Sequence, residues 1–345
     1  MVNSKKINIG IIGGGGIVKS RHVPGFLNIK NTSLSGICNR SLESSEKFAK
    51  QYNVSTIFSS PEELIQSKNI DAVLIGTWPY KHCEYTLKSL AAGKHVFVQA
   101  RMCMNFEEAK QMNKASLANP HLATMICPSP FGFSADLTIR KLMDEHYIGK
   151  VLTVKYTNLG KFSPEATLTW RHLKKYSGLN IMAVGIYYET ISRWVGPAQE
   201  VFAIKSQNVK ERMDTEDNCM KLVEIEDEII ITGKLKNGGS FNYHFGSANH
   251  PPSERIEIYG TEGTIIFHFD KDFLQIAKRG SELVTHEINT SQKKEWQVEQ
   301  NFIHQIVTNQ KQEATFEEGL SYMAFTQAIY DSGVKKSLID LNQYL

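Results

Sequence analysis

Four consecutive glycines, Gly13 to Gly16, directly follow the apolar run Ile7 to Ile12. A buried strand that enters a glycine turn and continues into a helix allows the backbone to approach a pyrophosphate, because no side chain stands in the way and backbone amides bind the negative charge. The third glycine position of the dinucleotide fingerprint falls on Val18, so the match is incomplete. The turn nevertheless predicts dinucleotide binding, with these residues as cofactor contacts: Gly13, Gly15, Gly16 and Ile17.

The second apolar run ends in Asn39, Arg40 and Ser41, where a dinucleotide-binding domain normally has an acid for the ribose hydroxyls. Asn39 can hydrogen-bond a ribose, whereas Arg40 and Ser41 can accommodate a 2′-phosphate. Arg40 is as well explained as a solvated surface residue. The sequence therefore leaves both NAD and NADP open as the cofactor.

The elements that must position these residues alternate between short apolar runs and segments of helical period, which is typical of βαβ units. We expect five strands, at Ile7–Ile12, 33–38, 72–76, His95–Val98 and 124–127. Together they predict a doubly wound parallel sheet, that is, a Rossmann domain.

Pro128 and Pro130 interrupt regular structure and mark a boundary, so we expect a dinucleotide-binding domain over 1–127 and a second domain over 128–345. The second domain is expected to have a helix over 135–146, a strand over 151–158 and a long helix over 178–195. The β-rich runs of 201–288, with turns at 236–239 and 261–263, predict a largely antiparallel sheet, and helical periodicity returns near Val298. The predicted fold class is α/β, with an N-terminal Rossmann sheet and a C-terminal α+β domain built on a large, open sheet.

Composition excludes several kinds of partner. Hydrophobic residues make up 41% and charged residues 22% of the 345-residue chain, as in soluble globular proteins. The net charge of +3 comes without a dense basic run, so neither nucleic acid nor a membrane surface is expected as a partner. The five cysteines are scattered and the histidines dispersed, so no metal site is predicted. The N-terminal apolar run is too short for a signal core or a membrane span, which favours a cytoplasmic protein.

The order and spacing of several motifs resemble the Gfo/Idh/MocA family of nicotinamide-dependent oxidoreductases over nearly the whole chain. The motifs are the glycine turn at 9–17, Thr77 to His82, Ala92 to Val96, Trp170-Arg171, Tyr176-Ser177-Gly178, Tyr259 to Thr264 and Phe316 to Leu320. The resemblance implies a sugar, inositol or polyol substrate. It also implies an open C-terminal sheet, often used to form homodimers or homotetramers, and an active site between that sheet and the nicotinamide ring.

The family's catalytic groups are replaced in this chain. Ala100 stands where the family has a lysine that touches cofactor and substrate. Ala183 and Tyr187 stand where the family has an aspartate and, four residues later, a histidine. All three standard groups are therefore absent.

Substitute groups lie at the same positions. We assign Tyr187 as the acid or base, Arg101 as the cation that favours its phenolate or binds a substrate oxygen, and Asn180, expected on the same helix face, as a group that orients a hydroxyl. Gln99 is assigned to the cofactor. The alternative for Tyr187 is that its ring packs in the domain interface.

Two further segments are assigned by the resemblance. Thr77, Trp78 and His82 follow the third long strand and are assigned to the cofactor; His82 could also be purely structural, and Trp78 a core residue. Trp170 and Arg171 match the substrate-side loop, where an aromatic face suits a sugar ring and a guanidinium suits hydroxyls, with interdomain packing as the alternative.

These substitutions leave three functions open. The first is an NAD(P)-dependent oxidoreductase that acts on CH–OH groups of carbohydrates through a modified proton relay. The second is a lyase or epimerase that keeps its cofactor and oxidises the substrate transiently. The third is a catalytically silent dinucleotide-binding regulatory protein. Fold alone does not decide among them.

Overall fold

The computed structural model describes residues 6–129, 133–160, 166–288, 291, 293 and 295–344. These residues form two compact units, which are described separately. The first comprises Met1–Pro128 together with Gln297–Met323, and the second comprises Ser129–Trp296 together with Ala324–Leu345. The chain leaves the first unit at Pro128, close to the predicted boundary, whereas Pro130 lies outside the described residues.

A second domain running without interruption from 128 to 345 was expected, but residues 297–323 return to the first unit. The physical reason is an aromatic cluster. The Phe302 ring lies 5.4 Å from that of Phe97 and 6.5 Å from that of Phe26, between ring centroids. Burial of these three rings ties the segment to the first unit.

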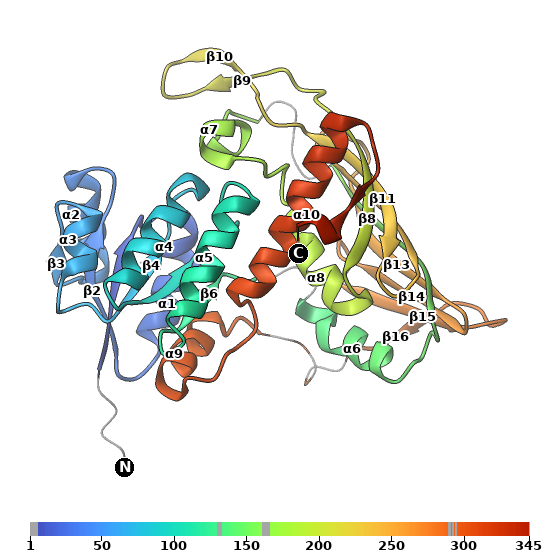
Figure 1. Cartoon of the computed structure of the whole chain (residues 1–345), viewed down its shortest axis with the longest axis horizontal. Coiled ribbons are helices and arrows are strands. Elements are labelled where there is room, and N and C mark those ends of the chain that lie inside the picture. The colour runs from blue at the N-terminus through green and yellow to red at the C-terminus, as the bar shows by residue number, and fades with distance from the viewer. Residues whose placement is uncertain are drawn as a thin grey trace. The chain divides into compact units, whose positions relative to one another are not determined.

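The first unit is built on a six-stranded parallel sheet with the order β3-β2-β1-β4-β5-β6 (Figure 1). Its strands are β1 Ile7–Ile12, β2 Thr32–Cys38, β3 Thr56–Ile57, β4 Ala72–Ile75, β5 His95–Val98 and β6 Thr124–Ile126. The five predicted strands are present, and the order is that of a dinucleotide-binding fold. Strand β3 was missed because its two residues are exposed and form no apolar run.

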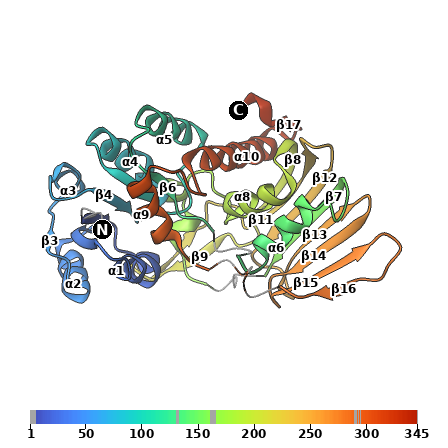
Figure 2. The same ribbon diagram turned by 90° about the horizontal axis from the view of Figure 1, so that it is seen from below.

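Helices cover both faces of this sheet. They are η1 Val18–His22, which is π-helical, α1 Val23–Leu27, α2 Leu42–Tyr52, α3 Pro61–Gln66, the 3₁₀ turn η2 Pro79–Lys81, α4 His82–Ala91, α5 Phe106–Ala118 and α9 Val298–Thr308. Figure 2 shows α3, α4 and α5 on one side of the sheet and α1 and α2 on the other. Helix α9 packs against α1. With both faces covered, central strands such as β4 are buried along their whole length.

The second unit is built on a nine-stranded mixed sheet with the order β16-β15-β14-β13-β7-β12-β11-β8-β17. Only the β7–β12 pair is parallel among these neighbours, which confirms the largely antiparallel prediction. The predicted turns join β11 to β12 and β13 to β14 as hairpins. The strands are β7 Val151–Leu159, β8 Ala198–Ser206, β11 Glu228–Leu235, β12 Ser240–Gly246, β13 Ser253–Gly260, β14 Gly263–His268, β15 Phe273–Lys278, β16 Val284–His286 and β17 Ile339–Asp340, with β9 Glu211–Asp214 and β10 Cys219–Leu222 as a separate hairpin.

Helices α6 and α8 lie over one face of this sheet (Figure 2). The second unit contains α6 Phe133–Asp144, the 3₁₀ turn η3 Trp170–His172, α7 Lys174–Ser177, α8 Val184–Val195, part of α10 Phe316–Lys335 and η5 Leu341–Gln343. The second-unit part of α10 covers the sheet too, because the Phe325 ring stacks on Tyr188 of α8 at 3.7 Å. In the part of the chain that the structure describes, no helix is both long and apolar enough to cross a bilayer.

The long helix predicted over 178–195 begins only at Val184. Gly178 ends α7 with φ 65°, and Met182 has φ 47°, so the backbone between them is not helical. Left-handed residues cannot continue a right-handed helix, which is why the apolar periodicity extends further than the helix itself.

Candidate functional site

The glycine turn lies at the carboxyl end of β1, between the ends of β2 and β4. The N–H of Gly13 donates to the Cys38 carbonyl at 2.9 Å. Gly13 has φ +88°, and a Cβ there would lie 2.8 Å from the Thr77 nitrogen. A Cβ on Gly14 would lie 2.5 Å from the Phe48 ring. The fold of the turn itself therefore requires glycine at 13 and 14.

Gly15 and Gly16 differ from their neighbours because both are exposed and the space beside them is open. Among the described residues, a Cβ on Gly15 would meet only the Gly76 carbonyl oxygen, at 4.0 Å, and a Cβ on Gly16 would meet nothing within 4 Å. The chain's own packing does not need glycine at these two positions. A backbone left bare beside open space at this edge of a Rossmann sheet fits the close approach of a pyrophosphate.

Asn39 fixes the turn from the end of β2. Its Oδ1 accepts from the N–H of Gly14 at 2.7 Å, and its Nδ2 donates to the Ser44 carbonyl at 3.0 Å. The expected ribose ligand thus also holds the phosphate turn in place. Arg40 is exposed, and Ser41 caps α2 by accepting from the N–H of Ser44.

The segment after β4 holds three of the predicted cofactor residues. Trp78 is half-buried, with its ring 6.4 Å from that of Tyr80. Thr77 lies directly beside Gly13. His82, in contrast, is completely buried, and its Nδ1 and Nε2 lie 2.8 Å and 2.9 Å from the carbonyls of Arg101 and Thr77.

The predicted contact of His82 with the cofactor is therefore wrong. A ring that is 0% exposed offers no face to a ligand. Burial lowers the pKa of His82, although the carbonyls around it oppose that shift. The imidazole instead contacts backbone carbonyls of both the loop after β4 and the segment after β5, and so fixes the position of Thr77 relative to Arg101.

The segment after β5 contains Gln99, Ala100 and Arg101. The Ala100–Arg101 peptide bond is cis, and Arg101 is 7% exposed. The next residue, Met102, donates its N–H to the Tyr322 hydroxyl on the first-unit part of α10. Gln99 contacts His22, which in turn contacts Glu299. His22 and Glu299 could not be predicted as neighbours, because they lie 277 positions apart and belong to no motif.

In the second unit, Trp170 and Arg171 lie on η3, where the Arg171 guanidinium stacks on the Trp170 ring at 4.4 Å from its centroid. Arg171 is exposed and Trp170 is half-buried, so both remain accessible within this unit. The next residue, His172, accepts from the Thr169 N–H through Nδ1 at 3.0 Å. Burial, together with the charges of Arg212 and Arg171, lowers the pKa of His172 to about 4.

Tyr187 lies in the first turns of α8 and is half-buried. Its ring lies 5.9 Å from that of Tyr156 and 5.8 Å from that of Phe245, both on the sheet. Tyr156 donates to the buried Glu254 carboxylate at 2.9 Å. This aromatic and acidic neighbourhood was not predicted, because its members come from three separate strands.

Asn180 does not share a helix face with Tyr187, contrary to the prediction. It lies in the loop before α8, where its Nδ2 donates to the Ser177 carbonyl at 2.7 Å and only 3% of the residue is exposed. Asn180 therefore shapes the loop that leads into α8.

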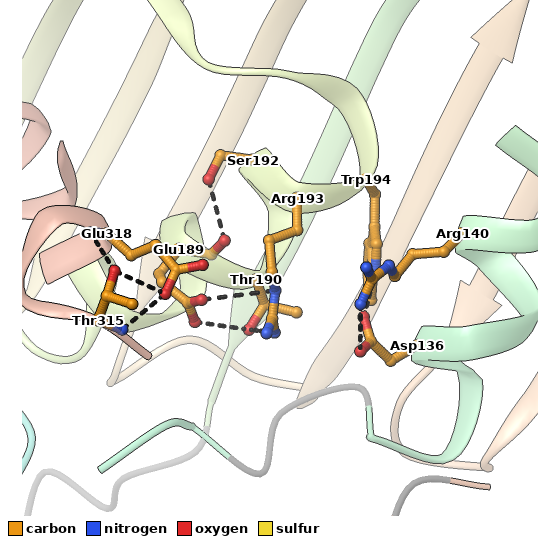
Figure 3. A network of polar contacts seen from close by, with 9 residues as sticks. All are labelled: Asp136, Arg140, Glu189, Thr190, Ser192, Arg193, Trp194, Thr315 and Glu318. Atoms are coloured by element: carbon orange, nitrogen blue, oxygen red, sulfur yellow. Dashed lines mark hydrogen bonds and ion pairs between the residues drawn. The ribbon is translucent and has the colours of Figure 1, made fainter. Parts of the chain in front are cut away.

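Polar contacts anchor α8 within the second unit (Figure 3). Trp194 donates from Nε1 to the fully buried Asp136 of α6 at 2.7 Å. One helical turn apart, Arg193 Nε lies 3.4 Å from Glu189 Oε1. These contacts fix the rotation of α8 and hence the side from which Tyr187 projects.

Comparison with known proteins agrees with this arrangement. The family model described as "Oxidoreductase family, NAD-binding Rossmann fold" matches residues 7–123, and the model of the "GFO/IDH/MocA C-terminal domain" matches residues 137–266. The chain belongs to the Gfo/Idh/MocA oxidoreductase family. Its first unit is the NAD-binding Rossmann domain of that family, and most of its second unit is the family's C-terminal domain.

Relatives of the chain differ in their named activities. Levoglucosan dehydrogenase of Pseudarthrobacter phenanthrenivorans is 24% identical over 303 residues, which cover 79% of this chain and 76% of the relative. The 2,7-anhydro-N-acetylneuraminate hydratase of Escherichia coli is 25% identical over 261 residues, covering 75% and 67%. A solved structure of levoglucosan dehydrogenase in complex with NADH and L-sorbose matches with a TM-score of 0.87 at 21% identity, covering 98% of this chain and 99% of that one. This likeness confirms the fold.

Proposed function

We propose that this protein is an NAD(P)-dependent oxidoreductase that acts on a CH–OH group of a sugar, polyol or related carbohydrate. The observation that carries the proposal is the open face of Gly15 and Gly16 on a Rossmann sheet. Gly13 and Gly14 are closed in by the protein's own atoms, whereas the face of Gly15 and Gly16 is left bare for a ligand. The relative named levoglucosan dehydrogenase supports the substrate class.

The glycine turn, Asn39, Thr77 and Gln99 would hold the cofactor, since all four lie at the carboxyl edge of the parallel sheet. When bound, a nicotinamide ring supplies the hydride acceptor for an alcohol carbon. The chain's own residues must then bind the sugar and take up the hydroxyl proton. We assign sugar binding to the stacked Trp170 and Arg171, which present an aromatic face beside a guanidinium.

The proton is assigned to Tyr187, because Ala100 and Ala183 carry no titratable group at the positions of the family's lysine and aspartate. A neutral phenol is a weak base, so the mechanism requires a cation that favours the phenolate. Arg101 is assigned that role. Asn180 is assigned to the shape of the loop before Tyr187, in place of direct contact with a hydroxyl.

A second function is favoured by one observation. The E. coli relative is named a hydratase, and the loss of the family's lysine, aspartate and histidine is compatible with chemistry other than net oxidation. A protein of this kind would form product without accumulating reduced nucleotide. A silent regulatory protein would bind the nucleotide and form no product.

The Tyr187→Phe variant tests the proton assignment. Loss of a positioned acid–base group lowers kcat by about 10²- to 10⁴-fold, while the affinity for NAD(P)H should be unchanged. The neighbouring Tyr188 is the matched control. It is buried, and its hydroxyl accepts from the Ala198 N–H at 2.9 Å, so Tyr188→Phe should reduce stability by about 1 kcal/mol and leave kcat unaffected. Equal turnover in Tyr187→Phe and wild type would remove the tyrosine from the mechanism.

We also propose a homodimer or homotetramer in solution. On the two neighbouring strands β8 and β11, the paired residues Ile204 and Ile230 are 57% and 38% exposed. Apolar side chains paired on an exposed sheet face are suited to burial against a second copy. Light scattering coupled to gel filtration measures the molar mass in solution. A monomer mass at all protein concentrations would contradict this proposal.

A further inference from the structure

Three buried polar side chains from distant parts of the sequence meet within the first unit. They are Glu299 of α9, His22 of η1 and Gln99 at the end of β5. Glu299 and His22 are each 0% exposed, and Gln99 is 9% exposed. The His22 Nδ1 lies 2.5 Å from Glu299 Oε1, and the His22 Nε2 contacts the Gln99 Nε2. The imidazole thus joins a buried carboxylate to a carboxamide at the carboxyl edge of the sheet.

The residues packed around Glu299 and His22 leave room for these contacts. A Cβ on Gly25 would lie 2.4 Å from the Glu299 Oε2, so only glycine leaves room for the carboxylate there. The other wall is aromatic, since the His22 ring stands edge-on to Phe97 at 4.9 Å between centroids. A buried acid and imidazole cost more to desolvate than apolar side chains of the same volume. Their presence in an otherwise apolar cluster therefore indicates a task beyond packing.

Hydrogen-bond polarity determines what Gln99 presents. The Glu299 carboxylate can only accept, so the His22 Nδ1 carries a proton and donates. The Gln99 amide nitrogen faces the His22 Nε2, so that nitrogen must accept and carries no proton. Gln99 thus donates to His22 and His22 donates to Glu299, and this hydrogen-bond order directs the Gln99 carboxamide oxygen away from the imidazole. No hydrogen bond to that oxygen is found among the described residues.

We propose that Glu299 and His22 are positioning residues that fix the Gln99 carboxamide, so that its oxygen is presented as an acceptor to a ligand N–H or O–H. Two donors share this chemistry, namely the carboxamide of a nicotinamide and a hydroxyl of the substrate. The identity of the ligand rests on the proposed function. The hydrogen-bond order among Glu299, His22 and Gln99 does not depend on that function. Reversal of that order would turn the Gln99 amide and present a donor in place of an acceptor.

The first test measures the His22 tautomer, which reports the hydrogen-bond order directly. In ¹⁵N-histidine-labelled protein, long-range ¹H–¹⁵N correlation spectra distinguish the two imidazole tautomers, and His22→Phe assigns the signal. We expect the Nδ1–H tautomer for His22 in wild type and a population of the Nε2–H tautomer in Glu299→Gln, where the amide can donate to Nδ1. A protonated or Nε2–H imidazole in wild type would overturn the proposal. This readout requires no cofactor.

The second test is a double-mutant cycle on ligand binding. Either the affinity for NADH or KM for the carbohydrate substrate should change about tenfold on Glu299→Gln in the wild-type background, but by less than about twofold in a Gln99→Leu background, because the carboxylate acts through that amide. If the donor belongs to the nicotinamide, the affinity for NADH falls and that for ADP-ribose does not. If it belongs to the substrate, KM for the sugar rises and the affinity for NADH is unchanged.

The controls separate this proposal from the proposed function. Glu43→Gln removes an exposed acid on α2 and should change neither quantity. An equal loss of affinity from Glu299→Gln in both backgrounds would show that Glu299 acts independently of Gln99 and would overturn the positioning role. Failure of wild type to bind either NADH or NADPH would contradict the proposed function, while the tautomer measurement would still test the order.

Discussion

The glycine turn allows a matched pair of substitutions that separates its structural from its functional residues. At Gly13 an alanine meets two obstacles, a backbone φ of +88° and the Thr77 nitrogen 2.8 Å from the new Cβ. The left-handed conformation costs about 1–2 kcal/mol and overpacking a further 1–3 kcal/mol. Gly13→Ala should therefore lower the free energy of unfolding by roughly 2–5 kcal/mol, a large part of a typical stability.

At Gly15 the same substitution meets neither obstacle. Gly15 is not at positive φ, and among the described residues the atom nearest to the new Cβ would be the Gly76 oxygen at 4.0 Å, so the free energy of unfolding should change by no more than about 0.5 kcal/mol. The new methyl group would instead occupy the space that a pyrophosphate needs. An overpacking cost of about 1–3 kcal/mol on the bound state corresponds to a loss of affinity of roughly 5- to 150-fold.

Urea denaturation followed by circular dichroism measures the stability of both variants, and fluorescence titration with NADH and NADPH measures their affinity. Gly15→Ala should be stable and bind poorly, whereas Gly13→Ala should be destabilised. Wild-type affinity in Gly15→Ala would refute the assignment of the open glycine face to the cofactor. A loss of stability as large as that of Gly13→Ala would refute the geometric reasoning.

Three further predictions follow from individual contacts. Asn39→Ala removes the acceptor of the buried Gly14 N–H and should lower the free energy of unfolding by about 1–3 kcal/mol, as measured by urea denaturation. An unchanged urea midpoint would show that this hydrogen bond does not stabilise the glycine turn. Arg40→Ala should weaken NADPH binding about tenfold and NADH binding by less than about twofold, and equal effects on both nucleotides would exclude a contact of Arg40 with the 2′-phosphate. The folded-state pKa of His172, about 4, lies below its ordinary value of 6.5, so between these pH values the unfolded chain binds a proton that the folded chain does not. The free energy of unfolding should therefore fall as the pH drops from about 6.5 towards 4, and His172→Gln should reduce that fall when denaturation is measured as a function of pH. Identical pH profiles for wild type and His172→Gln would contradict this prediction.

The sequence was sufficient to predict the features that depend on local patterns. The apolar runs located β1 and β5 at the observed residues, and the two glycine-containing turns located hairpins of the second sheet. Features with a weak local signal were missed. Strand β3 is two residues long, and α8 begins six residues later than its periodicity suggested, because Met182 adopts a left-handed conformation.

For the candidate site, the residue type and its position after a strand were enough to place Gly15 and Asn39 at the carboxyl edge of the first sheet. The structure changed the assignment of His82, because complete burial is a tertiary property that a motif does not reveal. The contacts among Glu299, His22 and Gln99 could not have been found, since the return of α9 to the first unit brings the carboxylate to the imidazole.

The most direct test of the proposed function incubates wild-type protein with NAD⁺ or NADP⁺ and a panel of sugars and polyols. Reduced nucleotide is followed by its near-ultraviolet absorbance, and carbohydrate products by mass spectrometry. We expect reduced nucleotide to accumulate with at least one carbohydrate, in equal amount to an oxidised product two hydrogens lighter, and to depend on Tyr187. Carbohydrate conversion without reduced nucleotide, or nucleotide binding without any product, would contradict the assignment as an oxidoreductase with net turnover.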